Sequence, residues 1–347
     1  MSKTKSNCKV GIDLGNRSYI ACRLSPQGDE EYLKGRLSEK GYRALKKWLN
    51  PNDEIFIESG SVSFVFARRI QRITKCTVSV LEARQLQIIY RSVKKTDKND
   101  AYRLASMGFL GSRFDLPIVR QPGIFTEKLR QLFSERMKLV RQLTQIKNQI
   151  YAYCISNGIS TIRRKDYASI QNLDELIQKV PESMRSRLLR LRKSFVVHEE
   201  LLEEVEAEMD ALVQENEGLQ VMITLYTSVP GIGKITAFGI AAYMGDFRDF
   251  SNRGSVSSFL GLVPRVDHSC TIRRTGHISK TGNRQLRSLL IMAAWSHVRT
   301  KKDSPITAFY LRLRESKGKK KAIVATARKI IETVYAMSKT GELYQAA

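Results

Sequence analysis

The chain has 347 residues, enough for two or three domains, and 42% of them are hydrophobic, which suffices for real cores. Lys and Arg number 59 against 34 Asp and Glu, and this formal net charge of +25 favours a polyanion as partner. Five scattered cysteines argue against a disulfide framework or a zinc site, and the lack of a long apolar run or signal core predicts a soluble, cytoplasmic protein without membrane contact.

The first hundred or so residues alternate between strand-like and helix-like periodicity. We expect strands over residues 9–13, 18–24, 30–37, 54–58 and 77–81, and helices over residues 37–49, 62–73 and 97–110. Three strands joined by tight turns, followed by strands that alternate with helices, predict one mixed sheet flanked by helices.

Two long helical patterns follow, over residues 126–157 and about 181–220. Two such helices around a short linker predict an antiparallel hairpin or coiled coil. A hairpin of this kind serves as a spacer or as a dimer arm.

The last section of the chain is strongly basic. Residues 251–330 hold eighteen Lys and Arg against only Asp267, Asp303 and Glu315. This imbalance is the strongest electrostatic indication of nucleic-acid binding in the chain.

Four carboxylates are expected to converge at one edge of the sheet. Asp13 ends the first predicted strand and Glu58 ends the fourth. Asp97 and Asp100 lie three residues apart at the start of a helix, where both side chains share one face. Oxygen ligands suit Mg²⁺ or Mn²⁺, and two such ions clamp the attacking and leaving oxygens of a phosphodiester.

Each carboxylate also has a purely structural alternative. In this alternative, Asp13 only shapes its turn, and Glu58 is only the exposed end of a strand. Asp97 is a good helix N-cap, and the helix dipole favours Asp100 in the first turn. The segment Gly11–Gly15 also resembles the phosphate turn of actin-like ATPases and sugar kinases, although no second Asp-x-Gly loop follows it.

The segment Val229-Pro230-Gly231-Ile232-Gly233-Lys234 resembles the turn of a helix-hairpin-helix. Backbone N–H groups of Gly231 and Gly233 at a helix start, together with Lys234, are expected to hold a DNA phosphate without reading its sequence. The alternative is a tight turn between two helices.

A basic loop around Ser269 is the last candidate site. A serine nucleophile needs a base or strong electrophilic stabilisation of the phosphate, and His268, His277 and several guanidinium groups are near it in sequence. The expected phosphate ligands here are Arg265, Arg273, Arg274, Lys280, Arg284 and Arg287.

In their order along the chain, these motifs resemble the DEDD transposases of bacterial insertion sequences (the "one-ten" group), which are bridge-RNA-guided DNA recombinases. The resemblance spans nearly the whole chain, and Lys95-Thr96-Asp97-Lys98-Asn99-Asp100-Ala101 is its most specific N-terminal motif. It also rests on Val10–Asp13, Ile55–Glu58, Val229–Gly233, Phe259–Pro264 and Gly276–Asn283.

The resemblance implies a role for each candidate. The metal ligands of a RuvC-like, RNase-H-type domain would be Asp13, Glu58, Asp97 and Asp100. Ser269 would attack DNA and form a covalent phosphoserine link. A non-coding guide RNA and both donor and target DNA are the implied partners. The sequence departs from the family at Cys270, where a glycine is usual, and at Ser59-Gly60, where Ala-Thr-Gly often follows the glutamate.

We therefore expect an α/β plus α protein of three parts. Residues 1–115 form a RuvC-like DEDD metal-binding domain, residues 116–222 a helical coiled-coil arm, and residues 223–347 a mostly helical transposase domain. The expected function is DNA recombination by transesterification, by dimers that assemble into tetramers on nucleoid DNA. The alternatives are a metal-dependent endonuclease of the Holliday-junction-resolvase type, without a covalent intermediate, and a non-catalytic nucleic-acid binder.

Overall fold

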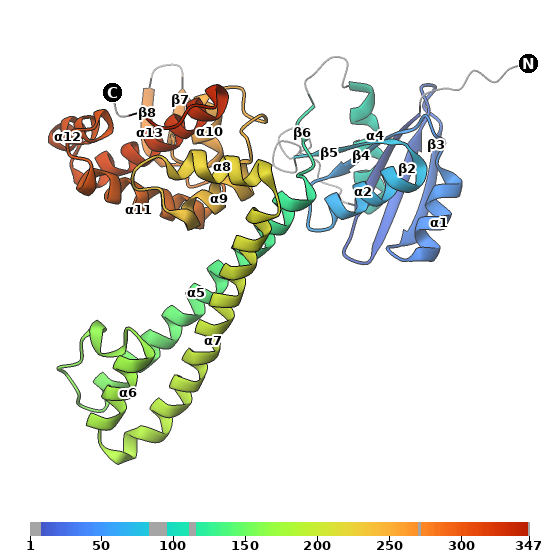
Figure 1. Cartoon of the computed structure of the whole chain (residues 1–347). Coiled ribbons are helices and arrows are strands. Elements are labelled where there is room, and N and C mark those ends of the chain that lie inside the picture. The colour runs from blue at the N-terminus through green and yellow to red at the C-terminus, as the bar shows by residue number, and fades with distance from the viewer. Residues whose placement is uncertain (1–7, 83–95, 111–115, 270–271, 346–347) are drawn as a thin grey trace, which may run out of the picture. The chain divides into compact units, whose positions relative to one another are not determined.

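The fold is taken from a computed structural model that describes residues 8–82, 96–110, 116–269 and 272–345 (Figure 1). The chain divides into two compact units, Met1–Gln121 and Pro122–Ala347. The hydrophobic side chains of each unit form cores of their own. None of the described helices has an apolar stretch long enough to cross a bilayer.

A six-stranded mixed sheet forms the centre of the first unit, with strand order β3-β2-β1-β4-β5-β6. The first three strands pair antiparallel, β4 and β5 continue parallel to β1, and β6 closes the edge antiparallel. The mixed sheet predicted from the sequence is thereby confirmed. Its strands are β1 (Lys9–Leu14), β2 (Ser18–Leu24), β3 (Glu30–Arg36), β4 (Glu54–Glu58), β5 (Thr77–Leu81) and the unpredicted β6 (Ile118–Val119).

Helices cover both faces of this sheet. Successive side chains of a strand point to opposite faces, so apolar side chains on both faces need a layer to pack against. On one face, side chains such as Ile12 and Ile57 pack with α1 (Glu39–Trp48) and α2 (Ser63–Thr74). On the other face, Phe56 packs with α4 (Asp97–Leu110). The first unit is therefore a three-layer α/β/α arrangement.

The second unit begins with an arm of two long helices, α5 (Ile124–Ser156) and α7 (Glu182–Gln214), which lie side by side (Figure 1). They run antiparallel, because Lys128 pairs with Glu208 whereas Lys147 lies over the ring of Phe195. Coiled-coil packing in the strict sense stays a prediction.

Two features of the arm differ from the sequence-based expectation. The linker at its far end is not short: it holds η1 (Arg164–Tyr167) and α6 (Ile170–Lys179) around a separate core. The second long helix ends at Gln214 and not near residue 220. The reason is a cap, because the Asn216 side chain accepts a hydrogen bond from the Leu219 N–H (2.9 Å) and starts α8 (Glu217–Thr227).

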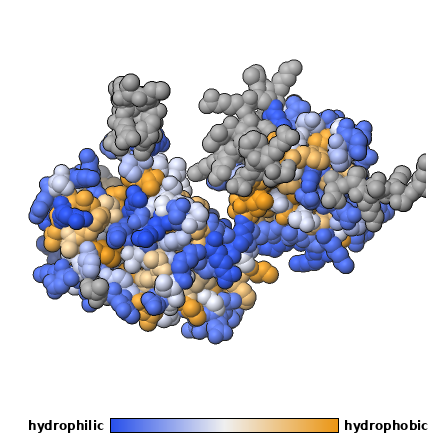
Figure 2. All heavy atoms as spheres, turned by 90° about the horizontal axis from the view of Figure 1, so that it is seen from above, coloured by the Kyte–Doolittle hydropathy of each residue, from blue (hydrophilic) through white to orange (hydrophobic). Residues whose placement is uncertain are grey.

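The rest of the second unit is mostly helical, as expected. Its large core surrounds α9 (Lys234–Met244), which is buried along most of its length. The face of the molecule seen in Figure 2 is mainly hydrophilic, with apolar residues in scattered patches. The other helices here are α10 (Arg253–Phe259), α11 (Arg284–Thr300), α12 (Pro305–Lys317) and α13 (Lys319–Thr340).

The segment expected to be a basic loop is instead an antiparallel hairpin of β7 (Pro264–Ser269) and β8 (Ile272–Ile278). The expectation was wrong because few apolar residues mark the alternation in these strands, and Gly276 interrupts it.

Candidate active site

Two of the four predicted metal ligands lie at the ends of neighbouring strands. Strands β1 and β4 pair in parallel with Ile12 opposite Ile57, so Asp13 and Glu58 follow at the same edge of the sheet. Both line one hollow of about 230 Å³. Asp13 is half-buried and Glu58 is exposed. The structure thus brings these two carboxylates together where the sheet opens to solvent.

The opposite wall of this hollow was not anticipated. It consists of residues 59–63, which lead from β4 directly into α2. Gly60 N–H donates to Ser63 Oγ (3.1 Å), and the Ser63 hydroxyl donates to the Gly60 carbonyl (2.9 Å). This tight turn sets the amino end of α2, the positive end of its dipole, beside two carboxylates. Its sequence signal is the run of small residues that directly follows Glu58.

Asp97 and Asp100 lie in the first turn of α4. The N-cap alternative for Asp97 is wrong, because Thr96 occupies the cap and its Oγ1 accepts from the Asn99 N–H (3.3 Å). Asp97 is exposed, whereas Asp100 is half-buried, with its Oδ1 3.6 Å from Nη1 of Arg103. Neither residue lines the hollow beside Asp13 and Glu58.

The direction of α4 follows from two glycines. A Cβ added at Gly11 would lie 2.0 Å from the Ala101 carbonyl oxygen, and one added at Gly108 would lie 3.0 Å from Cγ of Lys9. Because residue 101 lies over the middle of β1 and residue 108 near its start, α4 runs antiparallel to β1. Its first turn therefore points toward the edge where β1 ends.

The four candidate residues have the right donor atoms for a metal ion, but the structure does not bring all four side chains together. All four candidates supply carboxylate oxygens, the ligands that Mg²⁺ and Mn²⁺ prefer. Among the described residues, however, no three His, Cys, Asp or Glu side chains lie close enough together to hold one ion. The structure pairs Asp13 with Glu58 and leaves Asp97 and Asp100 on the neighbouring helix turn.

The predicted nucleophile ends a strand. The backbone of Ser269 is the last position of β7 and pairs with Ile272 at the tip of the hairpin. The side chain of Ser269, like those of Arg273 and Arg274, lies outside the described residues, and so does the whole of Cys270.

The base of this hairpin is held by backbone packed against backbone. Gly261 (φ +65°) and Gly282 (φ +72°) both adopt left-handed conformations, and added Cβ atoms would lie 2.4 Å from the Thr281 carbonyl oxygen and 1.9 Å from that of Phe259. The Lys280 N–H also donates to the Gly261 carbonyl (3.2 Å). Only glycine fits at these two contacts. The motif that contains Gly261 and the motif that contains Gly282, on either side of Ser269, therefore pack directly against one another.

Arg287 holds these two segments together through hydrogen bonds and does not face solvent as a phosphate ligand would. Its side chain is only 7% exposed, and Nη1 donates to the carbonyls of Leu260 and Thr281, each at 2.8 Å. Burial first, and then the charge of Arg284, lowers the pKa of Arg287. Its sequence context gave no sign of this, because Arg284 and Arg287 lie three residues apart at the start of α11, and only the packing around them leaves Arg284 exposed and Arg287 buried.

The Pro-Gly-Ile-Gly turn joins α8 to α9, as a helix-hairpin-helix turn would. Gly231 (φ +94°) packs against α11, where an added Cβ would lie 2.4 Å from the Ala293 carbonyl oxygen. The buried ring of His297 binds this turn, with Nδ1 2.7 Å from the Pro230 carbonyl and Nε2 2.7 Å from Ser304 Oγ. At Gly233, by contrast, an added Cβ would meet nothing within 4 Å. One side of the turn is therefore packed and the other is open.

The remaining predicted phosphate ligands differ in their availability. Arg265, Lys280 and Arg284 are exposed. Lys234 is ion-paired with Asp210 of α7. The first three are thus free to approach a polyanion, whereas Lys234 would first have to leave its carboxylate.

Comparison with known proteins identifies two segments. A family model described as "Transposase", that of the DEDD transposases of the IS110 group, matches residues 10–153, and one described as "Transposase IS116/IS110/IS902 family" matches residues 224–311. The first segment contains all four carboxylates and the second contains Ser269. Together they span well over half of the chain.

Individual relatives agree with these matches. The transposase for insertion sequence element IS1111A of Coxiella burnetii is 29% identical over 74% of this chain and 70% of its own length. The transposase for insertion sequence element IS1328 of Yersinia enterocolitica is 27% identical over 82% of both chains. The pilin gene-inverting protein of Moraxella lacunata is 24% identical over 97% of this chain and 96% of its own.

The order of the two matched segments, the transposases that align along 74% and 82% of the chain, and the two carboxylates at one sheet edge lead to the same conclusion: this chain belongs to the DEDD transposases of the IS110 family.

Proposed function

We propose that this transposase cuts and rejoins DNA through a covalent phosphoserine link at Ser269, with a divalent ion held by Asp13, Glu58, Asp97 and Asp100. The observation that carries the proposal is the hollow that Asp13 and Glu58 share, at the sheet edge toward which the first turn of α4 points. Such an edge, with an RNase-H-like sheet behind it, is suited to phosphodiester chemistry.

The reaction conserves phosphodiester energy. The Ser269 oxygen bonds to phosphorus while one deoxyribose oxygen leaves as a hydroxyl, and a second DNA end later displaces the serine by the reverse exchange. A divalent ion held by the carboxylates would supply Lewis-acid stabilisation of charge on the phosphate. The exposed guanidinium groups of Arg265 and Arg284 would hold neighbouring phosphates of the DNA backbone.

One experiment tests the covalent link. With labelled donor DNA and Mg²⁺, the native chain should form a protein–DNA adduct that survives denaturation, and Ser269→Ala should form none while it still binds DNA. Ser279→Ala is the matched control, because Ser279 lies at the base of the same hairpin with its Oγ 2.9 Å from Thr281 Oγ1. An adduct that persists in Ser269→Ala and is lost in Ser279→Ala would move the nucleophile to residue 279.

The metal site has its own test. Asp13→Asn or Glu58→Gln should abolish strand cleavage and leave the unfolding curve of the first unit unchanged. Glu54→Gln is the control, because Glu54 lies at the opposite end of β4 and pairs with Lys9 (2.7 Å). Cleavage that continues in chelator, or in either site variant, would remove these residues from the reaction. Cleavage in Mg²⁺ without any adduct would favour the endonuclease alternative.

Guidance by a non-coding RNA and assembly into dimers and tetramers are the remaining parts of this proposal. The net charge of +25 supports binding of a long polyanion. Sequencing of RNA that copurifies with the chain, and sedimentation of the chain with and without DNA, test them. Recombination that survives complete removal of RNA would rule out guidance.

A further inference from the structure

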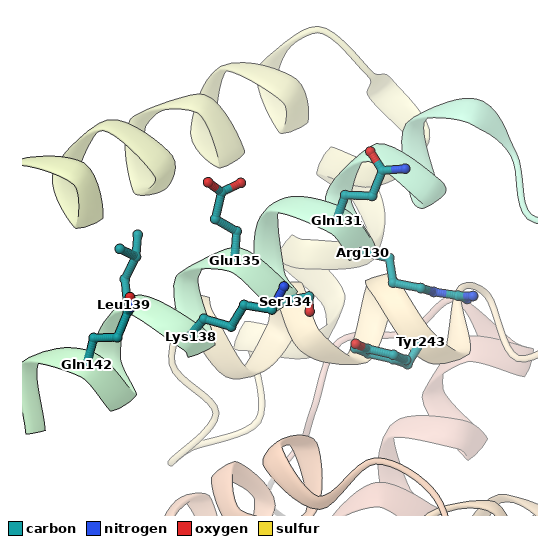
Figure 3. Close-up of a pocket in the computed structure, with 8 residues that line it drawn as sticks. All are labelled: Arg130, Gln131, Ser134, Glu135, Lys138, Leu139, Gln142 and Tyr243. Atoms are coloured by element: carbon teal, nitrogen blue, oxygen red, sulfur yellow. The ribbon is translucent and has the colours of Figure 1, made fainter. Parts of the chain in front are cut away.

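A second hollow, of about 680 Å³, lies in the second unit between α5 and α9 (Figure 3). One side of α5 between Arg130 and Gln142 forms its long wall, and Tyr243 near the end of α9 forms its end. None of these residues belongs to the carboxylate site or to the hairpin of Ser269.

Arg130 is held in place at this hollow but keeps most of its donors free. Its Nε donates to the Ala242 carbonyl (2.9 Å), which orients the planar guanidinium group. Within the described residues, the two Nη atoms have no hydrogen-bond acceptor. Burial is the main cause that lowers the pKa of Arg130, so its charge has lost part of its hydration. A guanidinium group stays protonated even so, and its free fork matches two oxygens of a phosphate.

Two other cations on the same helix are already paired, whereas Lys138, which also lines the hollow, has no ion pair among the described residues. Arg136 binds Glu206 of α7 (2.7 Å), and Lys128 binds Glu208 (2.9 Å). Arg130 forms no such ion pair among the described residues, although the charges of Tyr243 and Glu127 partly oppose the lowering of its pKa by burial. Glu135, the one acid that lines the hollow, points away from Arg130 and Tyr243 in Figure 3. The Nη donors of Arg130 are therefore open to a ligand.

Tyr243 adds an aromatic surface beside that charge. Its ring packs edge-on against Phe133 (centroids 5.9 Å apart, interplanar angle 78°), which fixes its orientation. Cζ of Arg130 lies over the Tyr243 ring, 5.2 Å from its centroid, in a cation–π contact. A half-exposed ring next to a guanidinium group with open Nη atoms is the combination that binds single-stranded nucleic acid, where bases stack on aromatic rings and cations hold the backbone.

We propose that this hollow binds a single-stranded segment of nucleic acid, with one phosphate on Arg130 and one unpaired base stacked on Tyr243. A duplex does not fit this description, because its base faces are already stacked on one another. The inference rests on the proposed function only in that the chain binds nucleic acid. Single-stranded DNA and single-stranded RNA share the required chemistry, so both are used as probes.

Photocrosslinking tests the stacked base directly. Short strands that carry 5-iodouracil, made as DNA and as RNA, are irradiated with the full chain, and the crosslinked peptide is identified by mass spectrometry. We expect a crosslink at Tyr243 with at least one strand type, and the stronger of the two identifies the natural ligand. Crosslinks that form elsewhere and never at Tyr243 would overturn the proposal.

Affinity measurements test both contacts. By anisotropy, Tyr243→Leu should weaken single-strand binding about 5- to 100-fold and leave duplex binding unchanged, whereas Tyr243→Phe keeps the ring and the affinity. Arg130→Gln should weaken binding and reduce the slope of log affinity against log salt by about 0.7, the share of one phosphate on a single strand. Arg136→Gln, which removes an equal charge from the same helix, should reduce neither as much.

Each outcome bears on a different claim. If the native chain binds neither single strands nor duplex DNA, the proposed function fails with this one, whereas a native chain that binds duplex DNA alone defeats only the present inference. If the native chain binds strands and forms the Ser269 adduct while Arg130→Gln and Arg136→Gln behave alike, only the present inference fails. Equal losses for single strands and duplexes in Tyr243→Leu would also overturn it. Circular dichroism of every variant separates loss of binding from loss of fold.

Discussion

Gly11 is the position at which α4 meets the sheet backbone to backbone, and Gly11→Ala should separate them. The added Cβ would lie 2.0 Å from the Ala101 carbonyl oxygen and 2.3 Å from the Ala105 nitrogen. Both are backbone atoms of one helix, so no side chain can rotate away, and α4 has to shift as a whole. Overpacking in a core typically costs 1–3 kcal/mol, and we expect about 3 kcal/mol or more here.

The shift should also affect the reaction, because α4 carries Asp97 and Asp100 in its first turn. We expect Gly11→Ala to lower Mg²⁺-dependent cleavage even at temperatures where the first unit stays folded. Trp48 and Trp295 are the two tryptophans of the chain, one in each unit. In a Trp295→Phe background, urea unfolding followed by Trp48 fluorescence therefore reports on the first unit alone.

Gly60→Ala is the matched control, because it makes the same substitution two residues after Glu58, where an added Cβ meets nothing within 4 Å. Its unfolding midpoint should equal that of the native chain. If Gly11→Ala also unfolded at the native urea concentration, the close packing of α4 on β1 would be refuted.

Two further predictions concern the second unit. Burial lowers the pKa of His297 below its usual 6.5, so the stability that depends on its neutral ring is complete above the unfolded pKa and is lost as pH falls through the folded pKa. The urea midpoint followed by Trp295 fluorescence should therefore drop between about pH 7 and pH 5. The drop should be smaller in His297→Gln, whereas the exposed His277→Gln should keep the native profile. Identical profiles for the native chain and His297→Gln would contradict this. Arg287→Lys keeps the charge but removes the guanidinium group whose Nη1 donates to two carbonyls, so it should cost about 1.5–3 kcal/mol by urea unfolding. The exposed Arg284→Lys should cost about 0.5 kcal/mol or less, and equal midpoints for the two variants would show that Arg287 is not internal.

Much of the first unit could be predicted from its sequence, because its pattern is local. Strands such as Ile55–Glu58 are short apolar runs between turn residues, and the helices show clear amphipathic spacing. The expected bounds differ from the observed ones by at most two residues. The edge position of Asp13 and Glu58 followed from the same reasoning, because parallel strands end on one side of a sheet.

Contacts between distant residues decided the rest. Ser269 lies on a hairpin because Gly261 and Gly282, twenty-one residues apart, allow two backbone segments to touch at its base. In the arm tip, η1 and α6 are short and are held by a core shared with both long helices. Neither the hairpin nor the arm tip shows a strong periodicity of apolar residues in the sequence.

By itself, the sequence determined the element types of the first unit, the family, and which residue types are available for phosphate chemistry. Only the tertiary structure decided which cations can use their charge. Nη1 of Arg287 donates to the carbonyls of Leu260 and Thr281, Arg136 is paired with Glu206, and Nε of Arg130 donates to a carbonyl while its Nη atoms stay open. The sequence alone does not distinguish these three arginines. They differ in function because the partner of a charged group is set by what the fold brings beside it.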